Sequence, residues 1–393
     1  MKMRKRTVIV SSNLMLCLVF LSVADAQIGD TIHPYAYARV LQDDNLFRVN
    51  TNEEKDTLTA LGAGVDALLI LSRQRINLGA QFERATYDKA DNLDHKNMNL
   101  NGNLNWVVGS DWRGRFGVKY RETIASFNET ATIRSRDDRA TLTSQGSAGY
   151  SFSPRWDIIG SMRTARLRID NRLNSDFDRF GYSTELRYAT GAKTKVGVKI
   201  GITNVDFEND TIIGSDTISS DFSNRVLSGT FSWEGSSKSK LDARIGWTDV
   251  EHDELTDRDF SGQSSRINYL WQTTAKSQLK FSLWREATTR FEVDSLVISQ
   301  GVSIRPRWNI TSKLSSSMML RYNKLDFRGD ANASLLGGVS REDTINSISL
   351  ALGYQISRVI KLDFRFITHD RDSNVPIQEY SYNTYRLGIR ARL

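Results

Sequence analysis

Residues 97–106 read Asn-Met-Asn-Leu-Asn-Gly-Asn-Leu-Asn-Trp, so that amides alternate strictly with apolar residues or glycine. Successive side chains of a β-strand point to opposite faces, which gives this segment one face of amides and one apolar face. Asparagine is a poor strand former and an odd choice for the solvent side of a soluble sheet. A transmembrane β-barrel explains the pattern, because its lumen is wet and its outer surface meets lipid.

The same alternation recurs along the chain between connections of two kinds. Short connections made of turn residues lie at 72–73, 109–111, 153–154, 191–193, 235–238, 275–277, 311–313 and 357–358. Long polar connections lie near 42–56, 88–95, 127–138, 169–178, 208–221, 251–263, 286–294, 328–343 and 370–379. This alternation of short and long connections is typical of outer-membrane barrels, which have short periplasmic turns and longer extracellular loops.

The segments between these connections predict an all-β fold, a transmembrane antiparallel up-and-down β-barrel of eighteen strands. The predicted strands are 33–41, 57–70, 74–87, 97–108, 112–124, 139–152, 155–168, 179–190, 194–207, 222–234, 239–250, 264–274, 278–291, 295–310, 314–327, 344–356, 359–369 and 380–393. An even number of strands places both termini on the periplasmic side. The segment 33–41 has the weakest strand pattern of the set. A barrel of sixteen strands is the alternative.

The first 26 residues predict a cleaved secretory signal peptide, which leaves residues 27–393 as a single barrel domain. Basic residues precede an apolar stretch, and Ala24-Asp25-Ala26 has the small-x-small pattern of a cleavage site. The only cysteine, Cys17, lies inside this segment, so we expect no disulfide in the mature chain. The expected location is the outer membrane of a Gram-negative bacterium.

Hydropathy and tryptophan placement agree with a barrel. The mean hydropathy of −0.42 is that of many soluble proteins, but inward-facing and lipid-facing residues cancel along every barrel strand. The strand phase predicts that Leu104 and Leu350 face lipid, whereas Asn103 and Ser349 face water. Five tryptophans lie within a few residues of a short connection, where an aromatic girdle at the membrane interface is expected: Trp106, Trp112, Trp156, Trp233 and Trp308.

Charge is distributed unevenly, although the formal net charge is only +7. Most acidic residues lie in or beside the long connections, where they either bind divalent cations that bridge lipopolysaccharide or simply solvate the loops. Bases gather near the short turns on the polar phase of their strands: Arg75, Arg113, Arg115, Lys195, Lys240, Arg305, Arg307, Lys361, Arg390 and Arg392. We predict that these ten residues, the basic mouth, favour anions in the lumen. The alternative is that they pair with Asp111, Asp157, Asp242 and Asp363 and brace the wall.

Catalysis, cofactor binding and metal binding find little support. The four histidines, His33, His95, His252 and His369, are not spaced as metal ligands, and three of them lie in or beside long connections. The sequence has no nucleophile elbow, zinc-protease motif or phosphate-binding loop. Nucleic-acid binding is disfavoured because the bases are predicted inside a pore. We therefore expect a protein that is not an enzyme and has no cofactor.

Two regions carry a resemblance to known proteins. Near the start, His33-Pro34-Tyr35 is followed by Asp43 to Arg48 (Asp-Asp-Asn-Leu-Phe-Arg), by Leu61-Gly62-Ala63-Gly64-Val65 and by Ser72-Arg73-Gln74-Arg75. These segments resemble the β-barrel porin family that includes EpsL, the outer-membrane protein of exopolysaccharide operons associated with PEP-CTERM/exosortase systems. At the end, Arg386-x-Gly388-x-x-Ala391-x-Leu393 resembles the C-terminal signal read by barrel-assembly machinery.

The family resemblance implies an outer-membrane barrel that takes part in exopolysaccharide biosynthesis or export. The partners it implies are outer-membrane lipids, lipopolysaccharide, the barrel-assembly machinery, a polysaccharide and periplasmic export components. It brings no catalytic residues. From the residues alone, two other functions stay open: a passive porin for small anionic solutes, and a structural or adhesive barrel without transport.

Overall fold

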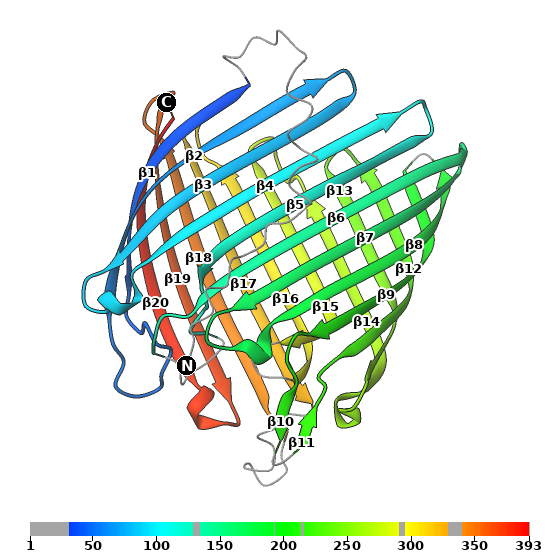
Figure 1. Cartoon of the computed structure of the whole chain (residues 1–393). Coiled ribbons are helices and arrows are strands. Elements are labelled where there is room, and N and C mark those ends of the chain that lie inside the picture. The colour runs from blue at the N-terminus through cyan, green and yellow to red at the C-terminus, as the bar shows by residue number, and fades with distance from the viewer. Residues whose placement is uncertain are drawn as a thin grey trace.

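Eighteen antiparallel strands form one closed barrel (Figure 1). The computed structural model describes residues 31–128, 134–191, 193–213, 216–290, 295–328 and 340–392, so the predicted signal segment 1–26 lies outside the described residues. Strand β1 pairs with β2 on one side and with β20 on the other, which closes the sheet and leaves no free edge. Within these residues, no helix is long and apolar enough to cross a membrane.

The wall strands are β1 (Ile32–Asp43), β2 (Asp56–Leu71), β3 (Gln74–Tyr87), β4 (His95–Val108), β5 (Trp112–Ile124), β6 (Asp138–Ser153), β7 (Trp156–Ile169), β8 (Phe177–Gly191), β9 (Thr194–Phe207), β12 (Phe222–Ser236), β13 (Ser239–His252), β14 (Phe260–Trp271), β15 (Ser277–Arg290), β16 (Ser295–Asn309), β17 (Leu314–Arg328), β18 (Glu342–Gln355), β19 (Ile360–Ser373) and β20 (Tyr380–Arg392). The prediction of eighteen strands is confirmed, and the alternative of sixteen is wrong.

Short turns join the strands at one end of the barrel, called here the short-turn end. Long connections join them at the other end, the long-loop end (Figure 1). The long connections contain short elements that the sequence pattern did not predict. These are the hairpin of β10 (Thr211–Ile213) and β11 (Asp216–Ile218) and the 3₁₀ turns η3 (Asp91–Leu93), η4 (Leu173–Ser175), η5 (Thr256–Arg258) and η7 (Pro376–Gln378).

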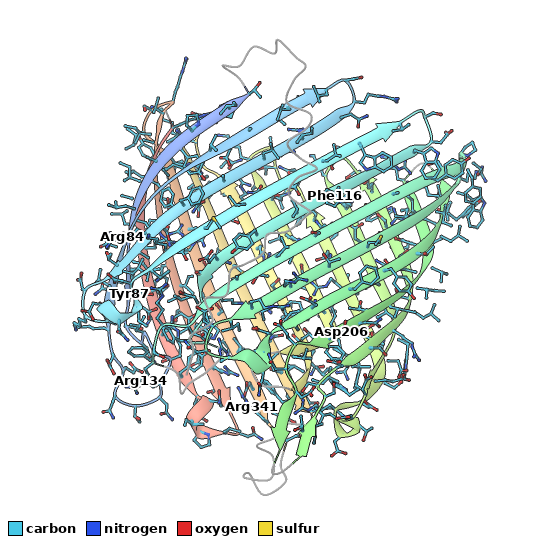
Figure 2. The ribbon with its side chains drawn as sticks, in the orientation of Figure 1. Arg84, Tyr87, Phe116, Arg134, Asp206 and Arg341 are labelled. Atoms are coloured by element: carbon cyan, nitrogen blue, oxygen red, sulfur yellow. The ribbon has the colours of Figure 1, made fainter. Side chains whose placement is uncertain are left out.

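The register of the strands separates an inward and an outward face. In-register partners share a face, and Asn103 pairs with Gly117 while its neighbour Leu104 pairs with Phe116. The outward face carries large exposed apolar side chains, of which Phe116 is labelled in Figure 2. Ser349 and Leu350 alternate in the same way on β18. The outward face also carries the tryptophans near the short turns, including Trp112, Trp156, Trp233 and Trp308.

The inward face departs from the expected polar pattern at the long-loop end. A cluster of buried apolar residues lies there on the inward phase of β7, β8, β9, β12, β13 and β14: Leu167, Ile169, Phe177, Val205, Phe222, Val250 and Phe260. Leu296 and Ile298 of β16 complete this cluster, although both are on the outward phase of their strand. The outward side of β16 therefore packs against the inward side of the wall formed by β7 to β14.

The end of β15 and the start of β16 consequently fold into the lumen. Leu296, Val297 and Ile298 are only 1%, 0% and 2% exposed, so residues on both faces of this segment are covered. The pairing of β14 with β15 stops at Ser265 and Arg285, which frees the last residues of β15 to leave the wall. We call the described residues Glu286–Thr288 and Leu296–Gln300 the inward hairpin.

Candidate functional site

The amides that suggested a barrel line its lumen. Strand β4 is in register with β3 and β5, and its alternate asparagines share one face with Asn77 and Gln81 of β3 and with Lys119 of β5. Asn101 donates to the carbonyl of Gly79 at 3.4 Å, and Asn97 donates to Glu83 at 2.7 Å. Amides offer both donors and acceptors. This part of the wall therefore presents uncharged hydrogen-bonding groups of both kinds, next to the charged side chains of Lys119 and Glu83.

All ten predicted residues of the basic mouth are described and lie on the inward phase. The register connects them strand by strand: Arg75 to Asn105, Asn105 to Arg115, Lys280 to Arg305, and Lys361 to Arg390. Each lies within a few residues of the short-turn end of its strand. The structure thus places the ten on one ring of the inner wall, and what they do there stays a prediction.

Four of the ten take part in ion pairs. Arg113 and Lys195 both reach Asp157, at 2.9 and 3.3 Å. Lys240 lies 3.4 Å from Glu234 and 3.8 Å from Asp242. Arg390 pairs with Asp66 at 3.0 Å. The bracing alternative therefore describes part of the set.

The other six bases have no carboxylate partner among the described residues: Arg75, Arg115, Arg305, Arg307, Lys361 and Arg392. Asp111, one of the acids expected to brace them, accepts a hydrogen bond from Ser110 instead, and Asp363 pairs with Arg386. The short-turn end of the lumen consequently carries an excess of positive charge. Low-dielectric walls with one sign of charge concentrate counter-ions between them.

Further bases line the middle of the lumen, and the sequence analysis did not single them out. Arg244 and Arg266 both bind Glu286 at the base of the inward hairpin, the first at 2.8 Å. Arg321 lies 5.0 Å from the ring centre of Trp284, whose indole donates to Ser299 at 3.1 Å. These residues share the polar phase of the predicted ten but lie farther from the short turns. A search of the whole polar phase would have found them.

Segments from distant strands meet at the long-loop end. Asn128, in the connection after β5, accepts hydrogen bonds through its carbonyl from Arg371 of β19 and Tyr380 of β20, at 3.1 and 3.4 Å. Its side chain accepts from Arg48, in the connection after β1, at 2.8 Å. Strand β5 is six strands from β19 around the barrel. These contacts therefore span part of the barrel opening at the long-loop end.

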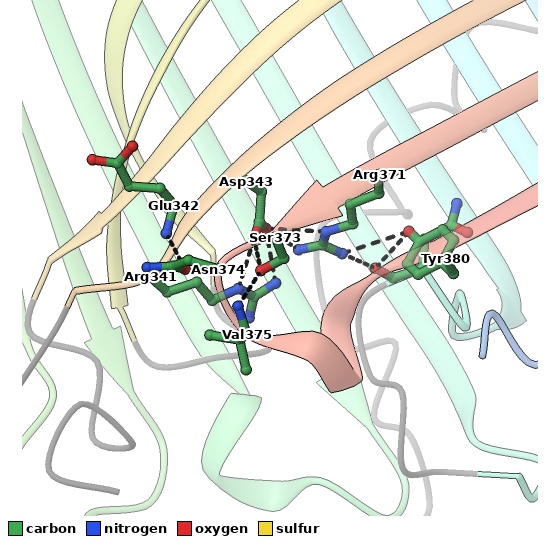
Figure 3. A network of polar contacts seen from close by, with 9 residues as sticks. Arg341, Glu342, Asp343, Arg371, Ser373, Asn374, Val375 and Tyr380 are labelled. Carbon is green, nitrogen blue, oxygen red and sulfur yellow. Dashed lines mark hydrogen bonds and ion pairs between the residues drawn. The ribbon is translucent and has the colours of Figure 1, made fainter. Parts of the chain in front are cut away.

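Arg371 belongs to a buried charge network, which Figure 3 shows from close by. Asp343 is fully buried and binds Arg371, Arg341 at 2.9 Å and Ser373 at 2.6 Å. A buried carboxylate without such partners is strongly destabilising. The network therefore fixes the strand ends on which the connection after β5 rests. Next to it, a cavity of about 180 Å³ is lined by Asp43, Arg48, Tyr87 and Phe127, among others.

Three of the four histidines, and several acids of the long connections, make structural contacts. His95 Nδ1 lies 2.8 Å from the carbonyl of Leu93, and His252 Nδ1 lies 3.2 Å from Asp259. His369 stacks beside Tyr380 and Tyr382. In the described ranges, no group of three or more His, Cys, Asp or Glu side chains is arranged to hold a metal ion. Several acids at this end form ion pairs, among them Asp137 with Arg172 and Glu342 with Lys324.

Comparison with solved structures finds outer-membrane barrels. OccK2 (OpdF) of Pseudomonas aeruginosa is 11% identical, with a TM-score of 0.49 over 93% of this chain and 98% of that chain. OpdK of P. aeruginosa is 10% identical, with a TM-score of 0.45 over 93% and 99%. The siderophore receptor PirA of Acinetobacter baumannii is 8% identical, with a TM-score of 0.47 over 92% and 80%. At these sequence identities and TM-scores, the likeness supports no statement about a substrate of this chain.

Comparison at the level of sequence gives one family. No curated protein matches the chain significantly. The family model described as "Putative beta-barrel porin 2" matches residues 215–393. The segments from His33 to Arg75 that carried the first resemblance lie outside this match. The match confirms the resemblance to a β-barrel porin family over the C-terminal part of a chain whose described residues form one closed 18-stranded barrel.

Proposed function

We propose that this protein is an outer-membrane pore that takes part in exopolysaccharide export. The observation that carries the proposal is the continuous inward face, where the asparagines of β4 adjoin bases without carboxylate partners, such as Arg75 and Arg115. Amides exchange hydrogen bonds with sugar hydroxyls, and bases attract acidic groups. An acidic polysaccharide carries both hydroxyl groups and acidic groups along its whole length.

The orientation follows from the usual topology of such barrels. With the short turns in the periplasm and the long connections outside, the basic mouth faces the compartment from which a polymer would enter. The family resemblance supports the same role, because it points to outer-membrane proteins of exopolysaccharide operons.

A passive porin for small anionic solutes is the second candidate. The bases without ion pairs favour it as much as they favour polymer export. The inward hairpin counts against it, because Leu296, Val297 and Ile298 fill space in the lumen near the long-loop end. Free diffusion of small solutes needs an open lumen. A channel that exports one polymer can stay narrow while no polymer is bound.

The test is deletion of the chromosomal gene, with complementation by the full chain. We expect surface polysaccharide to fall several-fold and acidic polymer to build up in the periplasm, measured by uronic-acid assay of the two fractions. Uptake of small organic anions should be unchanged. Normal surface polysaccharide together with slower anion uptake would overturn the proposal and support the passive porin.

A further inference from the structure

Two tyrosines of β1 lie flat across the neighbouring strand. Tyr35 and Tyr37 are on the inward phase, in register with Gly64 and Gly62 of β2. A Cβ atom on Gly64 would lie 2.5 Å from the ring of Tyr35, and a Cβ atom on Gly62 would overlap the ring of Tyr37. Glycine inside a strand marks such a close approach. One face of each ring therefore rests on backbone. Tyr35 is buried at 6% exposure, whereas Tyr37 is partly exposed on the inward face.

The tyrosine hydroxyls are fixed by the next strands of the wall. Tyr37 donates to Glu83 at 2.9 Å and accepts from Gln81 at 2.7 Å, while Tyr35 donates to Gln81 at 3.4 Å. Glu83 also binds Arg39 at 2.6 Å, so its charge is already compensated. The rings are held from both ends, and we call Tyr35, Tyr37, Gly62 and Gly64 the tyrosine platform.

Positive charge surrounds this platform. The guanidinium of Arg390 lies 3.5 Å from the ring centre of Tyr35, and its pairing with Asp66 leaves both side chains about half exposed, at 46% and 54%. Arg392 is in register with Tyr35, and Lys361 is in register with Arg390. Neither Arg392 nor Lys361 has an ion pair within the described part of the chain. Three bases thus face one acid.

Unsatisfied polar atoms lie on the same patch of wall. Arg39 Nε, Asn97 Oδ1 and Asn99 Oδ1 are buried and have no hydrogen-bond partner among the described residues. Asn97 and Asn99 are in register with Glu83 and Gln81, the two residues that hold the tyrosine hydroxyls. A buried polar atom without a partner is costly. All three atoms are closed to solvent, so a ligand reaches them only if the neighbouring side chains shift.

We propose that the tyrosine platform, together with Arg390, Arg392 and Lys361, is a binding subsite for an acidic sugar unit such as a hexuronate. The apolar C–H face of a pyranose ring stacks on Tyr37, and the sugar carboxylate accepts charge-assisted hydrogen bonds from the bases. The amides of β4 bind the hydroxyl groups. The inference rests on the proposed function and names the class of polymer that the pore handles.

Binding of two trisaccharides to the purified full-length barrel in detergent, measured by calorimetry, tests this subsite. Trigalacturonate is acidic and maltotriose is neutral, and the wild-type barrel should bind the acidic sugar more tightly. Arg390→Gln should lower the affinity for trigalacturonate by about tenfold, since a charge-assisted hydrogen bond is among the stronger polar contacts. It should leave maltotriose binding unchanged. Tyr37→Leu should weaken the binding of both sugars.

The matched control uses the same aromatic–glycine contact on the other face of the wall. Trp106 covers Gly114 on the outward phase, in register with it, as Tyr37 covers Gly62. Trp106→Leu should therefore leave both affinities unchanged. Tyr37→Phe keeps the ring and should retain binding, which guards against a folding defect in Tyr37→Leu. Each variant is checked by its heat-modifiable migration in gels.

Two results would overturn the subsite. Trigalacturonate binding that is unaffected in both Tyr37→Leu and Arg390→Gln would mean that the rings only fill space over the glycines. Equal losses in Tyr37→Leu and Trp106→Leu would point to general loosening of the barrel.

The binding and deletion experiments together separate the subsite from the export function. If the variants lose trigalacturonate binding while surface polysaccharide is normal in the deletion strain, the subsite stands and the proposed export function fails. If deletion abolishes export while binding ignores the variants, only the subsite fails.

Discussion

Asn103 and Leu104 are adjacent in the chain and lie on opposite faces of β4, in register with Gly117 and Phe116. Their identities follow from the medium that each face meets, water or lipid. The same logic explains why single residues were assigned correctly from the sequence. A strand has a period of two, so one strongly patterned segment fixes the phase of every residue in it.

The corresponding prediction compares one charge on the two faces. Leu104→Arg places a cation toward the middle of the lipid face and should cost about 2–4 kcal/mol of folding free energy. Asn103→Arg adds the same cation to the wet lumen and should cost little. Urea titration of both variants in lipid vesicles, followed by gel migration of the folded form, measures the difference. Similar midpoints would mean that the assigned faces are wrong.

At the scale of elements, the strands were predictable because their signals are local. The turn residues and the alternation placed most strand ends within two residues of those observed. Three ends differ by more: β14 begins at Phe260 rather than 264 and ends at Trp271 rather than 274, and β19 ends at Ser373 rather than 369. Apolar side chains and charges mix at the first and last of these ends, so the period no longer separates strand from loop there.

The inward hairpin and the tyrosine platform were not predictable, because both depend on contacts between distant segments. Leu296 reads as a lipid-facing residue of β16 and becomes buried only against Phe260 and the wall beyond it. Tyr37 meets Gly62 only once the register of β1 and β2 is set. The sequence analysis predicted the strands that became β1 and β2, and it quoted segments of both. It did not predict the register between these two strands.

The inward hairpin leads to a prediction about conductance. Leu296→Asp combined with Ile298→Asp puts two carboxylates into an apolar cluster, at a cost of several kcal/mol per uncompensated buried charge. The substitutions also remove the two apolar side chains, whose burial stabilised the segment by about 1.5–3 kcal/mol each, so the segment should leave the cluster. Single-channel conductance in planar bilayers should then rise.

The control for this prediction is the pair Leu296→Ala and Ile298→Ala, which shortens the side chains without adding charge. It should raise conductance less than the aspartate pair. A folded aspartate variant with wild-type conductance would show that the inward hairpin does not restrict the channel.

At the scale of the whole molecule, the barrel separates its charges along its axis. Acidic residues concentrate in and beside the connections of the long-loop end, and several of them are already paired with arginines there, as Asp178 is with Arg166. At the short-turn end, six inward bases have no such partner among the described residues. A closed wall of low dielectric constant confines the resulting field to the lumen. We therefore expect ion selectivity to depend on the whole set of inward bases and on no single residue.

The last prediction removes part of that ring. Arg115→Gln, Arg305→Gln and Arg307→Gln together keep hydrogen-bonding capacity but remove three inward charges that have no ion pair among the described residues. The reversal potential across a salt gradient should show an anion preference in the wild type and a clear shift toward no preference in the triple variant. The wild-type preference should also fade with salt, because the screening length falls from about 10 Å at 0.1 M to about 3 Å at 1 M. As a control, Arg84→Gln, Lys96→Gln and Arg225→Gln remove the same number of charges from the outward phase of β3, β4 and β12, where Arg225 is paired with Glu251. This control should keep the anion preference, because its charges lie on the far side of the wall from the ions. Equal shifts in both triple variants would mean that net charge, and not its placement in the lumen, sets selectivity.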